Sequence, residues 1–172
     1  MESSAGAIVQ IGLALCFPLL LTAGALSDLL RYLIPNWIAL SLAVLAVPAL
    51  LLAGAGVQGL AGHLGVGFAV LVATSILFFR GLLGGGDVKL LAAAACWTGW
   101  PLIVPLVVYT AVAGGLLAAT LIVARRVFRN RTLRSSWASS LLNSTSGVPY
   151  GVAIAVGGWL VWSKLLVYSS AF

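Results

Sequence analysis

The stretch LLAAAACWTGWPLIVPLVVYT, residues 90–110, is apolar almost throughout and contains no charged residue. Similar runs fill most of the chain. Of the 172 residues, 62% are hydrophobic and 7% are charged, and the mean hydropathy is +1.18. Soluble domains carry about 25% charged residues. The sequence therefore predicts an all-α polytopic membrane protein in which residues 1–172 form a single membrane-embedded domain.

Six apolar runs follow one another, at residues 7–27, 37–54, 62–79, 88–100, 102–124 and 147–168. A membrane-spanning helix needs about 20 apolar residues, so we expect six transmembrane helices. WTGWP, residues 97–101, is expected to be the turn between the fourth and fifth. The fourth run is too short as drawn and is expected to begin earlier or to borrow flanking residues. Trp97, Trp100, Trp159 and Trp162 fit an aromatic belt at the membrane surface.

The basic residues predict the orientation in the membrane. With the N-terminus outside, eight of the nine Lys and Arg residues fall on the cytoplasmic side, and only Lys164 lies near the other face. The eight are Arg31, Arg80, Lys89, Arg125, Arg126, Arg129, Arg131 and Arg134. The positive-inside rule and anionic lipid account for this charge, so no nucleic acid partner is expected.

Two segments bear on this topology. The first apolar run is expected to be retained, because it exceeds the usual h-region of a signal peptide and Glu2 precedes it without Lys or Arg. The basic cytoplasmic loop, about residues 125–146, either lies along the inner leaflet as an amphipathic stretch or is a mobile loop.

The acidic residues are the strongest candidates for chemistry. The chain has three, of which Glu2 is terminal, while Asp28 and Asp87 lie at ends of apolar runs on the predicted cytoplasmic side. Ionisable residues in membrane segments are costly and are often functional. Two close carboxylates share a proton, so one serves as general base and the other as general acid in peptide hydrolysis. The alternatives are that Asp87 caps a helix and that Asp28 pairs with Arg31.

Gly84, Gly85 and Gly86 directly precede Asp87. Glycines permit positive φ and close approach of another chain, which a simple cap does not need. With Lys89 they also resemble a phosphate cradle, but neither the P-loop nor the dinucleotide spacing is present.

Other segments indicate structure more than chemistry. IPN, residues 34–36, predicts a helix start with Pro35 fixing φ and Asn36 capping, and VPYG, residues 148–151, predicts the entry to the last helix. His63 has no second metal ligand nearby in the sequence, and Cys16 and Cys96 form no C-x-x-C pair. No metal site is predicted, and the cysteines are expected to pack as small apolar residues.

Three segments together resemble the prepilin peptidases (type IV leader peptidases), a family of G-x-G-D intramembrane aspartyl peptidases. GGGDVK, residues 84–89, matches the G-x-G-D signature, and its Lys89 narrows the resemblance to the prepilin peptidases. DLLRYLIPN, residues 28–36, is similar to the family's first aspartate motif, and VPYGVAIAVGG, residues 148–158, to its last-helix motif. The three occur in family order.

The resemblance implies an endopeptidase in the bacterial cytoplasmic (inner) membrane with Asp28 and Asp87 as the catalytic pair. It would cleave the N-terminal leaders of type IV prepilin and Flp-pilin-like precursors at the cytoplasmic face, after a glycine that precedes an apolar helix. No cofactor is implied. Gly84, Gly85, Gly86 and Lys89 would border the substrate, and the supporting motif residues would be Arg31, Pro35, Asn36, Pro149, Tyr150 and Gly151.

The size of the first loop indicates the subtype. Larger members carry a cysteine-rich insert after the first helix and methylate the new N-terminus, whereas only six residues separate Leu30 from Trp37 here. The chain thus resembles the short, peptidase-only type of tight-adherence (Flp) pilus systems.

Several alternatives stay open. Lys89 would tune the aspartate pair, receive an acidic group of the substrate, or serve as an interfacial positive charge. Rival functions are a small proton- or cation-coupled transporter component that uses the two aspartates, and a membrane acyl- or phosphotransferase that uses the glycine loop.

Overall fold

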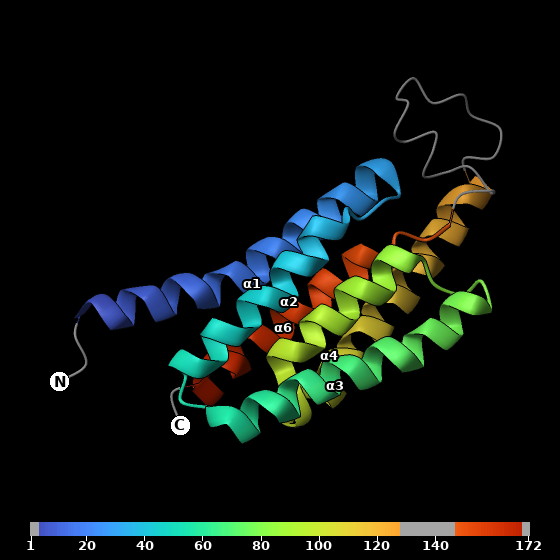
Figure 1. Ribbon diagram of the computed structural model, residues 1–172. Coiled ribbons are helices and arrows are strands. Elements are labelled where there is room, and N and C mark those ends of the chain that lie inside the picture. The colour runs from blue at the N-terminus through green and yellow to red at the C-terminus, as the bar shows by residue number, and fades with distance from the viewer. Residues whose placement is uncertain (1–3, 128–146, 170–172) are drawn as a thin grey trace.

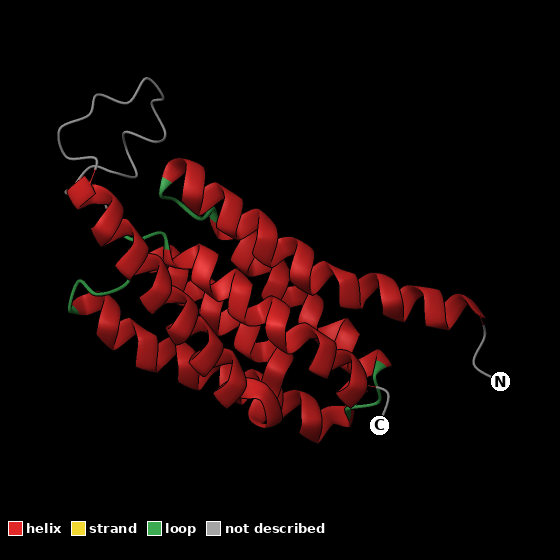
Figure 2. Cartoon of the chain, turned by 180° about the vertical axis from the view of Figure 1, so that it is seen from behind, coloured by secondary structure: helices red, strands yellow, loops and turns green. Residues whose placement is uncertain are grey.

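The computed structural model describes the backbone of residues 4–127 and 147–169 and the side chains of residues 8–127 and 147–165. Within these ranges the chain forms helices and no strand (Figure 2), so the predicted all-α class is confirmed. The five helices are α1 (Ser4–Arg31), α2 (Asn36–Leu52), α3 (Gly56–Phe79), α4 (Gly85–Val127) and α6 (Tyr150–Ser169).

Three of these helices are long and apolar enough to cross a membrane, namely α1 over Ile8–Arg31, α3 and α4. Helix α2 and residues Tyr150–Leu165 of α6 are apolar but shorter. The outward-facing side chains are also apolar, with Phe68 68% exposed, Phe79 84% and Leu116 64%. Soluble monomers rarely expose large contiguous apolar patches, so these features indicate a membrane protein. Six separate crossings remain a prediction.

The element α4 joins two helical halves across WTGWP, the segment where the sequence predicted a turn between two helices. Within it, Gly99 alone leaves the helical conformation, with φ 55° and ψ −165°. This positive φ favours glycine. A Cβ on Gly99 would also stand 2.6 Å from Cε1 of His63, whose Nδ1 donates a hydrogen bond to the Cys96 carbonyl at 3.0 Å. The predicted break therefore falls at Gly99, where the His63 ring covers the backbone.

The two halves of α4 run in opposite directions. Asp87 and Gly114 would lie about 40 Å apart along a straight helix. Yet the first turn of α6 meets both, because the Tyr150 ring packs against Gly114 and the Gly151 N–H faces the Asp87 carboxylate. The chain must therefore reverse near Gly99, and Figure 1 shows the yellow-green and orange ends of α4 at the same end of the molecule.

The connections divide between two ends of the bundle (Figure 1). The α1–α2 turn (32–35), the α3–α4 turn (80–84) and the start of α6 lie at one end. The α2–α3 turn (53–55) and the kink at Gly99 lie at the other, with the first turn of α1 and the last turn of α6. Asp28 and Asp87 belong to the first end, which we call the aspartate end.

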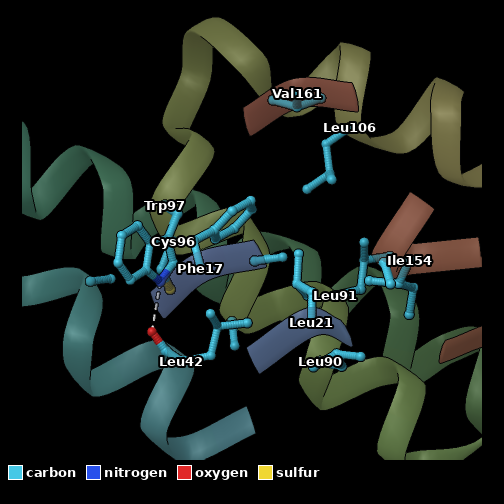
Figure 3. Packing of buried hydrophobic residues seen from close by; sticks show 14 of the residues in the cluster. Phe17, Leu21, Leu42, Leu90, Leu91, Cys96, Trp97, Leu106, Ile154 and Val161 are labelled. Atoms are coloured by element: carbon cyan, nitrogen blue, oxygen red, sulfur yellow. Dashed lines mark hydrogen bonds between the residues drawn. The ribbon is translucent and has the colours of Figure 1, made fainter. Parts of the chain in front are cut away.

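The core fills the space between α1, α2, α4 and α6 (Figure 3). Trp97 lies at its centre and is 3% exposed; its ring centroid is 5.4 Å from that of Phe17, and its Nε1 donates a hydrogen bond to the Leu42 carbonyl at 2.7 Å. Cys96 beside it is also buried, as expected for a packing residue. Glycines bring helices close where α3 meets α4, at Gly67, and where α4 meets α6, at Gly157. Small residues are typical of such close helix contacts in membranes.

The predicted aromatic belt is wrong for Trp97, which is a core residue. Trp100 is 71% exposed, as a surface position requires. Trp159 and Trp162 are partly exposed, but both donate hydrogen bonds to α1, to Thr22 Oγ1 at 3.0 Å and to the Ala14 carbonyl at 3.1 Å. The spacing of tryptophans near run ends did not distinguish interfacial rings from rings that bond across the bundle.

The basic loop falls largely outside the described residues. Arg129, Arg131 and Arg134 belong to residues 128–146, so both interpretations of this loop stay predictions. At its near end, the guanidinium of Arg125 donates a hydrogen bond to the Gly147 carbonyl at 3.2 Å. This contact joins the end of α4 to the segment that leads into α6.

Candidate active site

Asp28 lies in the last turn of α1 and is 6% exposed. Its Oδ2 accepts a hydrogen bond from the Gly151 N–H at 2.8 Å. A negative charge near the C-terminus of its own helix is unfavourable, whereas the N-terminus of another helix attracts it. Since Gly151 is the second residue of α6, this helix start supplies both the donor and the favourable dipole for the Asp28 carboxylate.

Asp87 lies in the first turn of α4 and is 7% exposed. Its Oδ2 accepts a hydrogen bond from the Gly84 N–H at 3.2 Å, which resembles the return bond of a capping box. Its Oδ1 is buried and has no hydrogen-bond partner within the described structure. An unsatisfied buried acceptor costs about 1–3 kcal/mol. The capping interpretation therefore accounts for one oxygen of Asp87 and leaves the other unexplained.

The two aspartates, 59 positions apart in the sequence, come together at the aspartate end. The charge of Asp28 acts on Asp87, and the Gly151 N–H that bonds Asp28 also faces the Asp87 carboxylate. The predicted pairing of Asp28 with Arg31 is not seen, because among the described residues Asp28 is bonded only through Gly151. Two buried carboxylates around one backbone amide can together hold a water molecule and exchange a proton with it.

The glycines before Asp87 give room to neighbouring side chains. A Cβ on Gly86 would stand 2.9 Å from the Cβ of Ile34, and one on Gly85 would stand 3.4 Å from the Phe78 ring. Gly84 is exposed and faces Asp87 itself. The expected close approach is therefore present, but the approaching groups at Gly85 and Gly86 belong to this chain. The expectation of positive φ was wrong at all three, since the nearby glycine with positive φ is Gly81.

The comparison with known families shows the family of the chain. Residues 15–119 match the family model described as type IV leader peptidase family. This chain belongs to the type IV leader peptidase family. The matched region contains both aspartates, the α1–α2 turn and the three glycines, and it ends before α6. No curated protein and no solved structure matches the chain.

In this leader peptidase, Lys89 joins the GGGDVK segment (84–89) to the DLLRYLIPN segment (28–36). Its Nζ donates a hydrogen bond to Asn36 Oδ1 at 2.9 Å, whereas no ion pair joins it to either aspartate within the described ranges. The prediction that Asn36 caps α2 was wrong. Pro35, with φ −60° and ψ 138°, occupies the cap position without a side-chain bond, and Asn36 is the first helical residue. Its amide oxygen is therefore free to accept from Lys89.

The last-helix motif contributes through its first residues. Pro149 is fully buried, and its carbonyl accepts the Val152 N–H at 3.2 Å, which starts α6 as predicted. Tyr150 packs on Gly114, and Gly151 faces Asp28 so closely that a Cβ there would stand 2.9 Å from Oδ2. Of the supporting motif residues, Gly151 bonds Asp28 and Asn36 accepts a hydrogen bond from Lys89, whereas Arg31 is exposed and bonds neither carboxylate within the described residues.

Other candidate groups lie apart from this site. An apolar cavity of about 120 Å³, which His63, Trp97 and Gln10 help to line, is at the opposite end of the bundle. Within residues 4–127 and 147–169, no three His, Cys, Asp or Glu residues come close enough to form a metal site. His63 packs against the backbone at Gly99.

Sequence reasoning missed Ile34 as a residue next to this site. Ile34 belongs to the IPN segment, but only Pro35 and Asn36 had an obvious backbone role there.

Proposed function

We propose that this protein is an aspartic endopeptidase that removes the N-terminal leader of type IV prepilin-like precursors, with Asp28 and Asp87 as the catalytic pair. The observation that carries the proposal is the convergence of two buried carboxylates at three helix ends, with Asp87 Oδ1 left without a partner. Membership of the leader peptidase family supports the substrate class.

The mechanism follows from the two carboxylates acting as a unit. A water molecule bound between them loses a proton to the ionised carboxylate and attacks the carbonyl carbon of the scissile peptide bond. The protonated carboxylate stabilises the developing oxyanion by donating a hydrogen bond. The C–N bond then breaks as the leaving amine receives a proton from the pair, which returns to the state with one shared proton. Asp87 Oδ1 is the oxygen that the protein leaves available for the water or the substrate carbonyl.

Access to the pair is narrow. Both aspartates are less than 10% exposed, whereas Gly84, which bonds Asp87, is exposed on the α3–α4 turn. An extended peptide that approaches over Gly84 would meet no side chain there.

The membrane setting completes the proposal. We place the protein in the bacterial inner membrane with six crossings, the N-terminus outside and the aspartate end in the cytoplasm. Arg31, Arg80, Lys89 and Arg125 all lie at helix ends on this side, which supports the positive-inside orientation. The short α1–α2 turn, residues 32–35, supports the peptidase-only, Flp-type assignment without methyltransferase activity.

The transporter alternative has less support. A coupling site would be expected near the bilayer midplane at a discontinuous helix. The discontinuity in α4 is at Gly99, about 18 Å along the helix from Asp87. Neither aspartate is therefore near it.

Co-expression with a prepilin-like precursor tests the proposal. The precursor should carry a leader that ends in glycine before an apolar helix, and the matched control should replace that glycine with valine. We expect mass spectrometry to show cleavage after the glycine in the first precursor and an intact control. Equal processing of both precursors, or of neither, would contradict the proposed specificity.

A further inference from the structure

Ile34 occupies a special place in the α1–α2 turn. It is 7% exposed and faces the starts of two other helices. Its Cβ lies 2.9 Å from where a Cβ on Gly86 would stand, and its Cδ1 lies 3.0 Å from where a Cβ on Gly151 would stand. The side chain therefore fills the space between the first turn of α4 and the first turn of α6.

These two turns carry the groups that hold the aspartates. Gly86 directly precedes Asp87, and the Gly151 N–H bonds Asp28. Any change in the gap between Gly86 and Gly151 therefore changes the separation of the two carboxylates. Gly86 and Gly151, which Ile34 faces in space, have no side chains. Their backbones therefore contact the isoleucine directly, and no side chain of theirs can change rotamer to fill the gap.

The turn that carries Ile34 is itself held firmly. Ser27 Oγ donates a hydrogen bond to the Leu33 carbonyl at 2.7 Å, and the Tyr32 N–H donates to the Asp28 carbonyl at 2.8 Å. Pro35 follows with φ fixed near −60°. Since Ile is branched at Cβ, its χ1 angle is also restricted. A rigid side chain on a fixed turn is suited to setting a distance.

We propose that Ile34 is a positioning residue that sets the separation of Asp28 and Asp87. It touches neither the substrate nor the reacting atoms, because it is buried beneath the two helix starts. The inference rests on the proposed function for its effect on cleavage, but its effect on geometry is independent of activity. A misplacement of about 1 Å is enough to cost a catalytic site about 100-fold in rate.

The kinetic test compares Ile34→Ala, Ile34→Val and Ile38→Ala by leader cleavage in proteoliposomes. Ile38 is 2% exposed and packs toward Gly24, so Ile38→Ala is a matched core truncation away from the carboxylates. For Ile34→Ala we expect kcat to fall about 10- to 100-fold with KM changed less than about twofold. Ile34→Val should restore most of the rate, and Ile38→Ala should keep kcat per folded molecule. Equal losses in Ile34→Ala and Ile38→Ala would overturn the proposal.

A cross-linking test separates the inference from the proposed function. Asp28→Cys and Asp87→Cys are combined with Cys16→Ala and Cys96→Ala, and disulfide formation is followed with copper phenanthroline as oxidant. We expect Ile34→Ala to slow cross-linking severalfold and Ile38→Ala to leave it unchanged. An unchanged rate in Ile34→Ala refutes the positioning role, whatever the activity. Slowed cross-linking in Ile34→Ala, together with no precursor cleavage by the protein that keeps Asp28 and Asp87, would uphold the positioning role and remove the proposed function.

Discussion

Replacing Gly151 with alanine perturbs the site at one atom. Gly151 is not among the described glycines with positive φ, so alanine fits its backbone conformation. The new Cβ would stand 2.9 Å from Asp28 Oδ2, 3.0 Å from Asp28 Cβ and 3.0 Å from Ile34 Cδ1. Carbon atoms prefer separations of about 3.5–4.0 Å, so Asp28 or the start of α6 must move by about 0.5–1 Å.

This movement should reduce activity as well as stability. A shift of about 1 Å in a catalytic group costs about 100-fold in rate. Weakening the hydrogen bond from the Gly151 N–H to a charged carboxylate removes about 1.5–3 kcal/mol of local interaction. We therefore expect kcat for leader cleavage by Gly151→Ala to fall by about two orders of magnitude.

Gly157→Ala is the matched control on the same helix. Its Cβ would meet Thr110 Oγ1 and stand 2.9 Å from the Thr110 N and 3.2 Å from the Leu106 carbonyl, which is more severe crowding but away from the carboxylates. Both variants are assayed in proteoliposomes for cleavage, and in detergent for thermal unfolding. Gly157→Ala should lower Tm and keep kcat per folded molecule. Wild-type kcat in Gly151→Ala, or an equal loss of kcat in Gly157→Ala, would refute the reasoning.

Two further substitutions test separate contacts. Lys89→Met removes the hydrogen bond to Asn36, worth about 0.5–1.5 kcal/mol, so cleavage should fall less than about tenfold, with Lys164→Met as the control at the other end; complete inactivity would mean that Lys89 takes part in the chemistry. Trp97→Phe leaves the Leu42 carbonyl without its donor, so the free energy of unfolding should fall by about 1–3 kcal/mol while kcat is kept; an unchanged Tm would contradict this.

The sequence predicted the helical class and gave Asp28 and Asp87 as the candidate catalytic residues because both inferences depend on strong signals, whereas it did not predict their contact. Apolar composition indicates membrane helices directly. Two acids in an otherwise apolar chain, each in a recognisable motif, leave few other candidates. The side of the membrane was predicted from the positions of Arg and Lys, and it stays a prediction.

Other features depend on contacts between distant segments, which no local pattern reveals. The contacts of Ile34 with Gly86 and Gly151, and of Lys89 with Asn36, arise only when the α1–α2 turn and the starts of α2, α4 and α6 come together. Trp97 was predicted at the membrane surface because its neighbours Gly99 and Pro101 look like a turn. The chain does reverse direction near Gly99, but the indole of Trp97 lies in the core.

The most direct test of the central claim is the single-turnover cleavage rate of the reconstituted enzyme with Asp28→Asn and with Asp87→Asn, each checked for wild-type Tm. If the two carboxylates share the proton transfers, each variant should lose about 10²–10⁴-fold in rate although its fold is intact. Cleavage at a near-normal rate by either folded variant would contradict the account.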